Sequence, residues 1–166
     1  MALPKLNTAK YTLSLPSSGE ELEYRPFLMS EQKNLMIAQE SEDDKQIQQS
    51  IANCIQDCTF GKVDAWSLPA FDVEYIFLQV RAKSVGEIAK FKIICPDDKE
   101  TYGDVEVDLS KVEVQVDDAH TNNIVLDEKR KLGVMMNYPN MKVLYSTQGV
   151  KSLKYEDVIN LIIGCI

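Results

Sequence analysis

The stretch from Trp66 to Glu87 constrains the fold of this chain more than any other part of the sequence. Its apolar residues recur at the i, i+3, i+4, i+7 spacing of an α-helix, and they do so on two adjoining faces. One face consists of Val73, Ile76, Phe77 and Val80, and the second of Phe71, Tyr75, Leu78 and Ala82. A helix with so little polar surface is buried between two other layers, so the rest of the chain must supply those layers.

The ends of this helix carry signals of their own. Ser67 and Pro69 predict its start, because a capping oxygen and a fixed φ both suit the first turn of a helix. A strand is the alternative, since apolar residues also alternate between Phe71 and Phe77. The proline at the entrance and the apolar continuation to Ala82 favour the helix.

An N-terminal β-hairpin is predicted before the helices. Tyr11–Leu15 and Glu21–Arg25 each alternate apolar and polar residues. Between them, Pro16–Gly19 supplies the fixed φ and the permissive glycine that a turn needs. The candidate core residues of the hairpin are Leu13, Leu15, Leu22 and Tyr24.

Two helices are predicted between the hairpin and the central helix. Ser30 is the expected cap of the first, which runs from Glu31 to about Glu40. The acidic run Glu40–Asp44 starts the second, and its apolar stripe consists of Ile47, Ile51, Cys54, Ile55 and Cys58. The two cysteines lie one turn apart, as half of a metal site could, but on a stripe of isoleucines we expect them to be core residues.

After Gly86 the pattern becomes that of short strands. Segments 88–95, 104–109 and 112–116 are β-rich, and two shorter ones follow at 124–126 and 132–136. Apolar residues alternate with acidic ones from 104 to 109, which is typical of an antiparallel sheet with one face in water. Residues 86–140 therefore predict a small antiparallel β subdomain inserted after the central helix.

The last twelve residues, Tyr155 to Ile166, have an apolar helical pattern. Such a helix docks into the core or onto a partner, or else the sequence was cut from something longer. The predicted fold class is α+β, with an N-terminal β-hairpin, three helices, the inserted β subdomain and a C-terminal helix. We divide it into a hairpin and helical half (1–85), the β subdomain (86–140), and a return segment with the C-terminal helix completing the core (141–166).

The net charge of −8 argues against a general binder of nucleic acid or of acidic membranes, because both require positive charge. The N-terminus has no apolar signal-peptide core, and no apolar run approaches the roughly 20 residues that span a bilayer. Four cysteines in 166 residues do not form a dense disulfide framework, so reduced cytosolic thiols are expected.

A metal site is weakly suggested by one turn. Cys95 precedes Pro-Asp-Asp98 at the position of a zinc knuckle, but Asp98 stands where a second cysteine is needed. His120, the only histidine, lies in a later loop. One thiolate and one imidazole match a closed tetrahedral site poorly, so we expect no zinc at Cys95 and His120. Since no nucleophile elbow or phosphate loop is present either, we expect no enzyme and no cofactor.

Several segments together resemble one protein family. They are Leu3–Thr8, Tyr24–Phe27, Phe71–Phe77, Arg81–Glu87 and Tyr138–Pro139. With this set the chain resembles the baseplate hub assembly proteins of T-even-type contractile-tailed phages, that is, of myoviruses. The resemblance covers nearly the whole chain, and its most specific part is the Arg81–Glu87 block.

The resemblance implies a late viral protein that is made in the host cytoplasm and is needed to build the baseplate hub. It implies a non-enzymatic, chaperone-like assembly factor that binds the hub or the tape-measure protein. The alternative is a permanent structural component of the baseplate in the virion. The turn after Cys95 then looks like a degenerate, zinc-ribbon-like knuckle that has lost ligands.

The expected partners are other phage tail proteins, with no nucleic acid and no membrane. An apolar helical groove that accepts a partner's amphipathic helix is the expected mode of binding. The candidate partner-binding residues are Tyr75, Leu78, Val158, Leu161 and Ile162. In the alternative, the central helix and the C-terminal helix only close the core and bind no partner. The sequence leaves open whether the chain forms a homo-oligomer.

Overall fold

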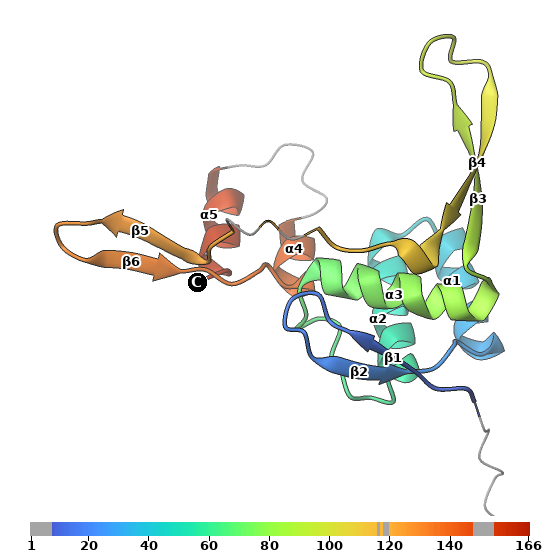
Figure 1. The fold of residues 1–166 in the computed structure, drawn as a ribbon, viewed down its shortest axis with the longest axis horizontal. Coiled ribbons are helices and arrows are strands. Elements are labelled where there is room, and N and C mark those ends of the chain that lie inside the picture. Colours follow the sequence, from blue (N-terminus) through green and yellow to red (C-terminus); the bar gives the residue numbers. More distant parts are fainter. Residues whose placement is uncertain (1–7, 116, 118–119, 148–154) are drawn as a thin grey trace, which may run out of the picture.

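The structure is a computed structural model that describes residues 8–115, 117, 120–147 and 155–166 (Figure 1). The elements in chain order are β1 (Tyr11–Ser14), β2 (Glu21–Tyr24), α1 (Met29–Glu40), α2 (Asp44–Cys58), α3 (Ala70–Val85), β3 (Ile88–Ile94), β4 (Tyr102–Asp108), the 3-10 turn η1 (Leu109–Lys111), β5 (Asn123–Asp127), β6 (Leu132–Met135), α4 (Met141–Thr147) and α5 (Tyr155–Ile163). The predicted α+β class, with its N-terminal hairpin and C-terminal helix, is confirmed.

The main core lies where the β1–β2 hairpin meets α2 and α3. Helix α1 packs against α2, and α2 packs against α3. The buried residues of this core are Leu13, Leu15, Leu22, Tyr24, Ala52, Cys54, Ile55, Cys58, Ala65, Val73, Ile76, Val80 and Met141. All four predicted core residues of the hairpin are among them. So are Cys54 and Cys58, which confirms them as core residues.

The central helix is confirmed as α3, and the strand alternative is wrong. Ile76 and Val80 are completely buried on the predicted face. The helix begins one residue after Pro69, which is its N-cap. Ser67 is not the cap, because its hydroxyl donates to the Asp64 carbonyl at 2.8 Å and completes the preceding turn.

Helix α1 begins earlier than predicted, and Ser30 is not its cap. The N-cap is Leu28, whose N–H donates to the Glu31 carboxylate at 2.7 Å. Arg25, at the end of the hairpin, pairs with the same carboxylate at 2.9 Å. A side chain inside the first turn therefore performs the capping and also ties the helix to the hairpin.

The strands between 86 and 140 form two hairpins that are not joined into one sheet (Figure 1). β3 pairs with β4 in an unbroken antiparallel register, and β5 pairs with β6. The strand predicted at 112–116 is wrong for its described residues 112–115. Asp108 accepts hydrogen bonds from the N–H and the hydroxyl of Ser110, at 3.1 and 2.6 Å, and this starts η1 directly after β4. Residues 112–115, which follow η1, are irregular.

Candidate functional site

Helix α5 turns an apolar surface outward. None of its nine residues is buried, although most of them are apolar. The exposed apolar side chains here are Tyr155, Val158, Ile159, Ile162, Ile163 and Ile166, which we name the α5 surface. The candidates Val158 and Ile162 belong to it and are 40% and 43% exposed, while the candidate Leu161 is half-buried. Apolar side chains gathered in this way make the α5 surface the candidate site for a partner.

Helix α5 is held in place by α4 and by Asn137, which lies before α4 in the chain. A Cβ atom at Gly164 would lie 3.0 Å from both methyl carbons of Val143, so glycine permits a close approach of the two segments. The carbonyl of Cys165 accepts a hydrogen bond from the N–H of Asn137 at 2.6 Å. These contacts hold the C-terminal end of α5 against α4 and the segment before α4.

Helix α4, which the sequence did not predict, joins α5 to the main core. Met141 at its start is only 1% exposed, and its N–H donates to the Leu68 carbonyl at 3.0 Å. Trp66 and Tyr145 pack edge to face, with ring centroids 6.4 Å apart. Helix α4 thereby connects the α5 surface to the main core.

The other two candidates lie on α3 and have different neighbours. Tyr75 is partly buried against the main core, and Leu78 is partly buried against a small second cluster. That cluster consists of Ala82, Ala89 and Leu109. Both side chains therefore contribute to packing, and Val158 and Ile162 are the exposed members of the predicted set.

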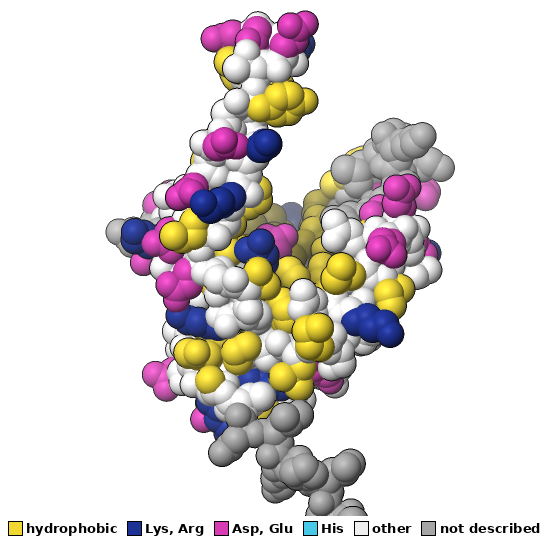
Figure 2. All heavy atoms as spheres, turned by 90° about the vertical axis from the view of Figure 1, so that its right-hand side faces the viewer, with side chains coloured by type: hydrophobic (Ala, Val, Ile, Leu, Met, Phe, Trp, Pro, Cys, Tyr) yellow, Lys and Arg dark blue, Asp and Glu magenta, His cyan; other side chains and the backbone are white. Residues whose placement is uncertain are grey.

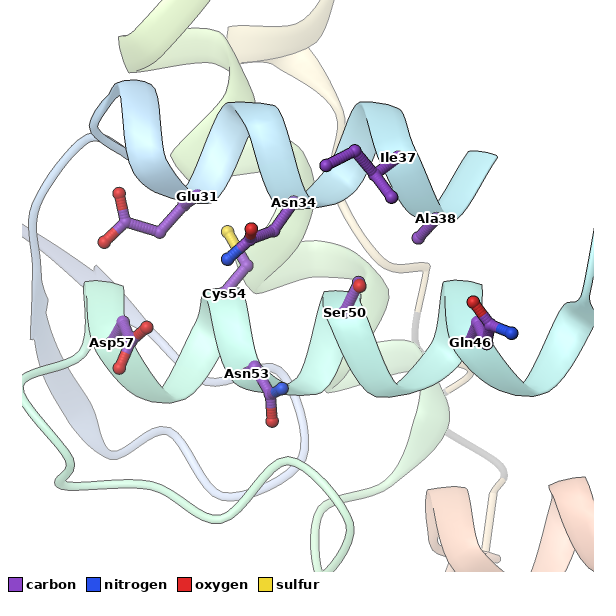
Figure 3. A pocket seen from close by; sticks show the side chains of 9 residues that line it. All are labelled: Glu31, Asn34, Ile37, Ala38, Gln46, Ser50, Asn53, Cys54 and Asp57. Carbon is purple, nitrogen blue, oxygen red and sulfur yellow. The ribbon is translucent and has the colours of Figure 1, made fainter. Parts of the chain in front are cut away.

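A pocket of about 240 Å³ lies between α1 and α2 (Figure 3). It is lined by Glu31, Asn34, Ile37, Ala38, Gln46, Ser50, Asn53, Cys54 and Asp57. Figure 3 shows Asn34 and Cys54 pointing toward one another across the gap between the two helices. The lining is mostly polar and includes two carboxylates but no lysine or arginine, so it does not offer an anion site.

The titratable groups of this pocket do not form a nucleophile. A contact with the Cys58 sulfur at 4.0 Å, together with burial, raises the pKa of the Cys54 thiol far above its ordinary value. Burial alone would raise the pKa of Glu31, but hydrogen bonds from Arg25, the Leu28 N–H and Ser30 outweigh it and lower that pKa. Cys54 is therefore a protonated thiol, and Glu31 is an ionised, paired carboxylate.

Cys95 and His120 lie in separate parts of the fold. Cys95 sits at the free end of the β3–β4 hairpin, where its N–H donates to the Thr101 carbonyl at 2.8 Å. His120 instead stacks on Tyr138, with ring centroids 5.7 Å apart. Within the described residues, no three His, Cys, Asp or Glu side chains are grouped as they are in a metal site.

Across the described parts of the chain, no helix combines the length and apolar character needed to cross a bilayer. A family model described as "T4 bacteriophage base plate protein" matches residues 8–166. No curated protein and no solved structure matches the chain.

Proposed function

Because the chain belongs to the T4 bacteriophage base plate protein family, it has a role in the phage baseplate, and we propose that this role is assembly. The chain binds a hub or tape-measure protein while the tail is being built, and it covers an apolar segment of that protein until the segment reaches its final contacts. The proposal includes no catalysis, no metal and no cofactor. Binding takes place in the host cytoplasm, where the tail components are made.

The observation that carries this proposal is the α5 surface. A helix with no buried residue and five exposed apolar side chains, followed by a sixth at Ile166, is costly in water unless another molecule covers it. Its apolar residues follow the i, i+3, i+4, i+7 spacing, so a partner helix can pack along it. Val158 and Ile162 lie at the centre of this stripe, and we propose that they contact the partner directly, with Leu161 supporting them.

A co-expression experiment tests the proposal. The tagged chain is produced with the hub and tape-measure proteins of the same phage, and the proteins that co-purify are identified by mass spectrometry. We expect one of these components to co-purify with the wild type and to be lost from the Val158→Ser/Ile162→Ser variant. Met36→Ser, which changes an exposed apolar residue of α1, is the matched control and should retain the partner. If none of these components binds the wild type, the assembly proposal fails.

A second measurement distinguishes the assembly factor from the alternative, a permanent structural component of the baseplate. Purified virions are analysed by quantitative mass spectrometry against known baseplate proteins. An assembly factor should be absent from mature particles or present far below stoichiometry. Stoichiometric presence would establish the structural role instead.

A further inference from the structure

The β3–β4 hairpin projects away from the helices (Figure 1). Seven residues of each strand pair, from Ile88 opposite Asp108 to Ile94 opposite Tyr102. An isolated two-stranded hairpin is at best marginally stable in water, so packing of another element against it would increase its stability.

The two faces of this hairpin differ in chemistry. One face is charged at its centre, where Lys90 forms an ion pair with Glu106 at 2.7 Å and Lys92 lies opposite Asp104. The ends of this face carry exposed apolar side chains, those of Ile88, Ile94 and Tyr102. The other, which we name the hairpin apolar face, consists of Ala89, Phe91, Ile93, Val105 and Val107. Its four larger side chains are between 37% and 53% exposed, although they are of the kind that forms protein cores.

The hairpin apolar face continues a surface that is already packed at one end. At the base of the hairpin, Ala89 and Leu109 are buried against Ala82 of α3. Alternation along the strands places Phe91, Val107 and Val105 on the same side as these buried residues. The described part of the chain covers the near end of this face and leaves its far end half exposed.

The edges of the hairpin are protected at their centre. The Leu109 N–H bonds to the Glu87 carbonyl at 2.7 Å, and the Cys95 N–H bonds to the Thr101 carbonyl at 2.8 Å. Because hydrogen-bonded pairs alternate in an antiparallel ladder, the outward-facing backbone groups belong to residues 88, 90, 92 and 94 on one edge and to residues 102, 104, 106 and 108 on the other. The charged side chains at positions 90, 92, 104 and 106 oppose the addition of another strand there.

The dimensions of the face indicate what can cover it. Two strands of seven residues form a ribbon about 23 Å long and about 10 Å wide, which is close to the diameter of an α-helix. The face offers the same area, about 230 Å², to any occupant, so area alone does not choose between a helix and a second copy of the hairpin. Two acidic hairpins repel one another, which makes a second copy the poorer occupant.

Charge favours a basic occupant. From Lys83 to Lys111 the chain carries seven carboxylates and five lysines, and Lys83, Lys90 and Lys111 each form an ion pair with one of these carboxylates. The other four carboxylates lie in the half of the hairpin toward its free end: Asp97, Asp98, Glu100 and Asp104. Figure 2 shows acidic side chains gathered at the free end of the hairpin, with apolar ones below them. These charges lie within about one Debye length of the apolar face, so they attract a positively charged partner.

We propose that the hairpin apolar face is a docking site for an amphipathic α-helix of another protein, with an apolar stripe flanked by lysines and arginines. The inference goes beyond the proposed function, because it assigns a second docking site that does not involve the α5 surface.

A defined peptide tests this site on the full chain. The probe is a fluorescein-labelled peptide of about 16 residues, long enough to span the ribbon, with leucines at helical spacing and lysines elsewhere. Its dissociation constant is measured by fluorescence anisotropy. We expect Phe91→Thr/Val105→Thr to raise that constant about tenfold, because threonine removes apolar surface and keeps strand propensity. The matched control, Val158→Thr/Ile162→Thr on α5, should leave it within about twofold.

Several outcomes would overturn the inference. One is equal affinity of the wild type and the hairpin variant. Others are equal affinity for a scrambled peptide without the stripe, or for a peptide with glutamates in place of lysines. Loss of binding only in the α5 variant would reject the hairpin site while leaving the α5 proposal standing. A dimer in sedimentation that the hairpin variant dissociates would assign the face to a second copy. If the double variant unfolds at a lower temperature than the wild type, the same binding measurement is repeated with Ile93→Thr. This substitution lies nearer the free end of the hairpin, away from its buried base.

Discussion

Asp72 and Glu31 are two carboxylates that the fold buries, and each joins a helix to a distant segment. Asp72 is fully buried at the start of α3 and accepts hydrogen bonds from the hydroxyl and the N–H of Ser17, the latter at 3.1 Å. Glu31 joins α1 to Arg25 at the end of the hairpin. The β1–β2 hairpin is therefore fastened to the helices at two points by polar side chains as well as by apolar packing.

Replacing Asp72 with alanine should lower the free energy of unfolding by about 1–3 kcal/mol. The change removes a fully buried acceptor and leaves the partly buried Ser17 donors without it. Urea unfolding followed by circular dichroism measures the effect. Glu74→Ala, an exposed position two residues further along the same helix, should change the free energy by less than about 0.5 kcal/mol. Equal effects at the two positions would contradict the buried-acceptor role.

The pairing of Glu31 predicts a pH dependence of stability. Its pKa is lower in the folded protein than in the unfolded chain, so the ionised form stabilises the fold above the unfolded pKa of about 4.3, and this stabilisation is lost as the pH falls through the folded pKa. At pH 7, Glu31→Gln should cost about 1–3 kcal/mol, and the difference from the wild type should shrink in more acidic solution.

Unfolding of the wild type and the Glu31→Gln variant, measured at a series of pH values, checks this prediction. Glu40→Gln, at an exposed carboxylate on the same helix, is the control and should follow the wild type at every pH. A constant difference between wild type and Glu31→Gln down to acidic pH would show that charge is not the cause.

At the scale of elements, the sequence predicted best those segments whose period extends over several turns or strand pairs. The hairpin strands, α2, α3 and α5 were all found in this way. Helix α4 was missed because seven residues give too few turns for a period to emerge. The strand at 112–116 was predicted from a β-rich segment, but no neighbouring strand pairs with its described residues 112–115, and propensity alone does not make a strand.

The candidate site was predictable in part. The exposed stripe of α5 follows i, i+3, i+4, i+7, i+8, i+11 from Tyr155 to Ile166, and a helical projection places Leu161 off it. The sequence therefore shows which residues lie on the stripe, but not that the stripe is exposed to solvent. Whether an apolar helix faces the core or the solvent depends on contacts such as Met141 with the main core, which no local pattern reveals.

The close approach of α5 to α4 gives a prediction at this scale. Gly164→Ala adds a methyl group within 3.0 Å of Val143 and should destabilise the α4–α5 contact by about 1–3 kcal/mol. Amide hydrogen exchange should accelerate in residues 155–163 and remain unchanged in α2. Val143→Ala in the same chain makes room for the new methyl group and should restore most of the protection. Failure of this rescue would mean that the two side chains do not meet.

At the scale of the whole molecule, the chain combines a well-packed centre with projecting hairpins. Most of the buried residues belong to the β1–β2 hairpin, α2 and α3, whereas the small second cluster holds only the base of β3–β4. Opening free energies should therefore fall from the centre toward the hairpin ends.

Native-state hydrogen exchange of the isolated protein checks this gradient. Amides of residues 73–80 in α3 should exchange slowest, and those of residues 91–105 in the projecting hairpin should exchange orders of magnitude faster. Addition of the basic peptide described above should slow the hairpin amides selectively. Equal protection of α3 and the hairpin in the isolated protein would contradict this picture.

The unbroken register of the β3–β4 hairpin has a consequence for the evolution of its length. Residues can be inserted or deleted near its free end without disturbing the main core. Because side chains alternate, only changes of two residues in each strand keep apolar and charged faces in phase. Natural variants of this hairpin should accordingly differ by four residues or multiples of four, while the turn that bonds Asp72 should keep a constant length.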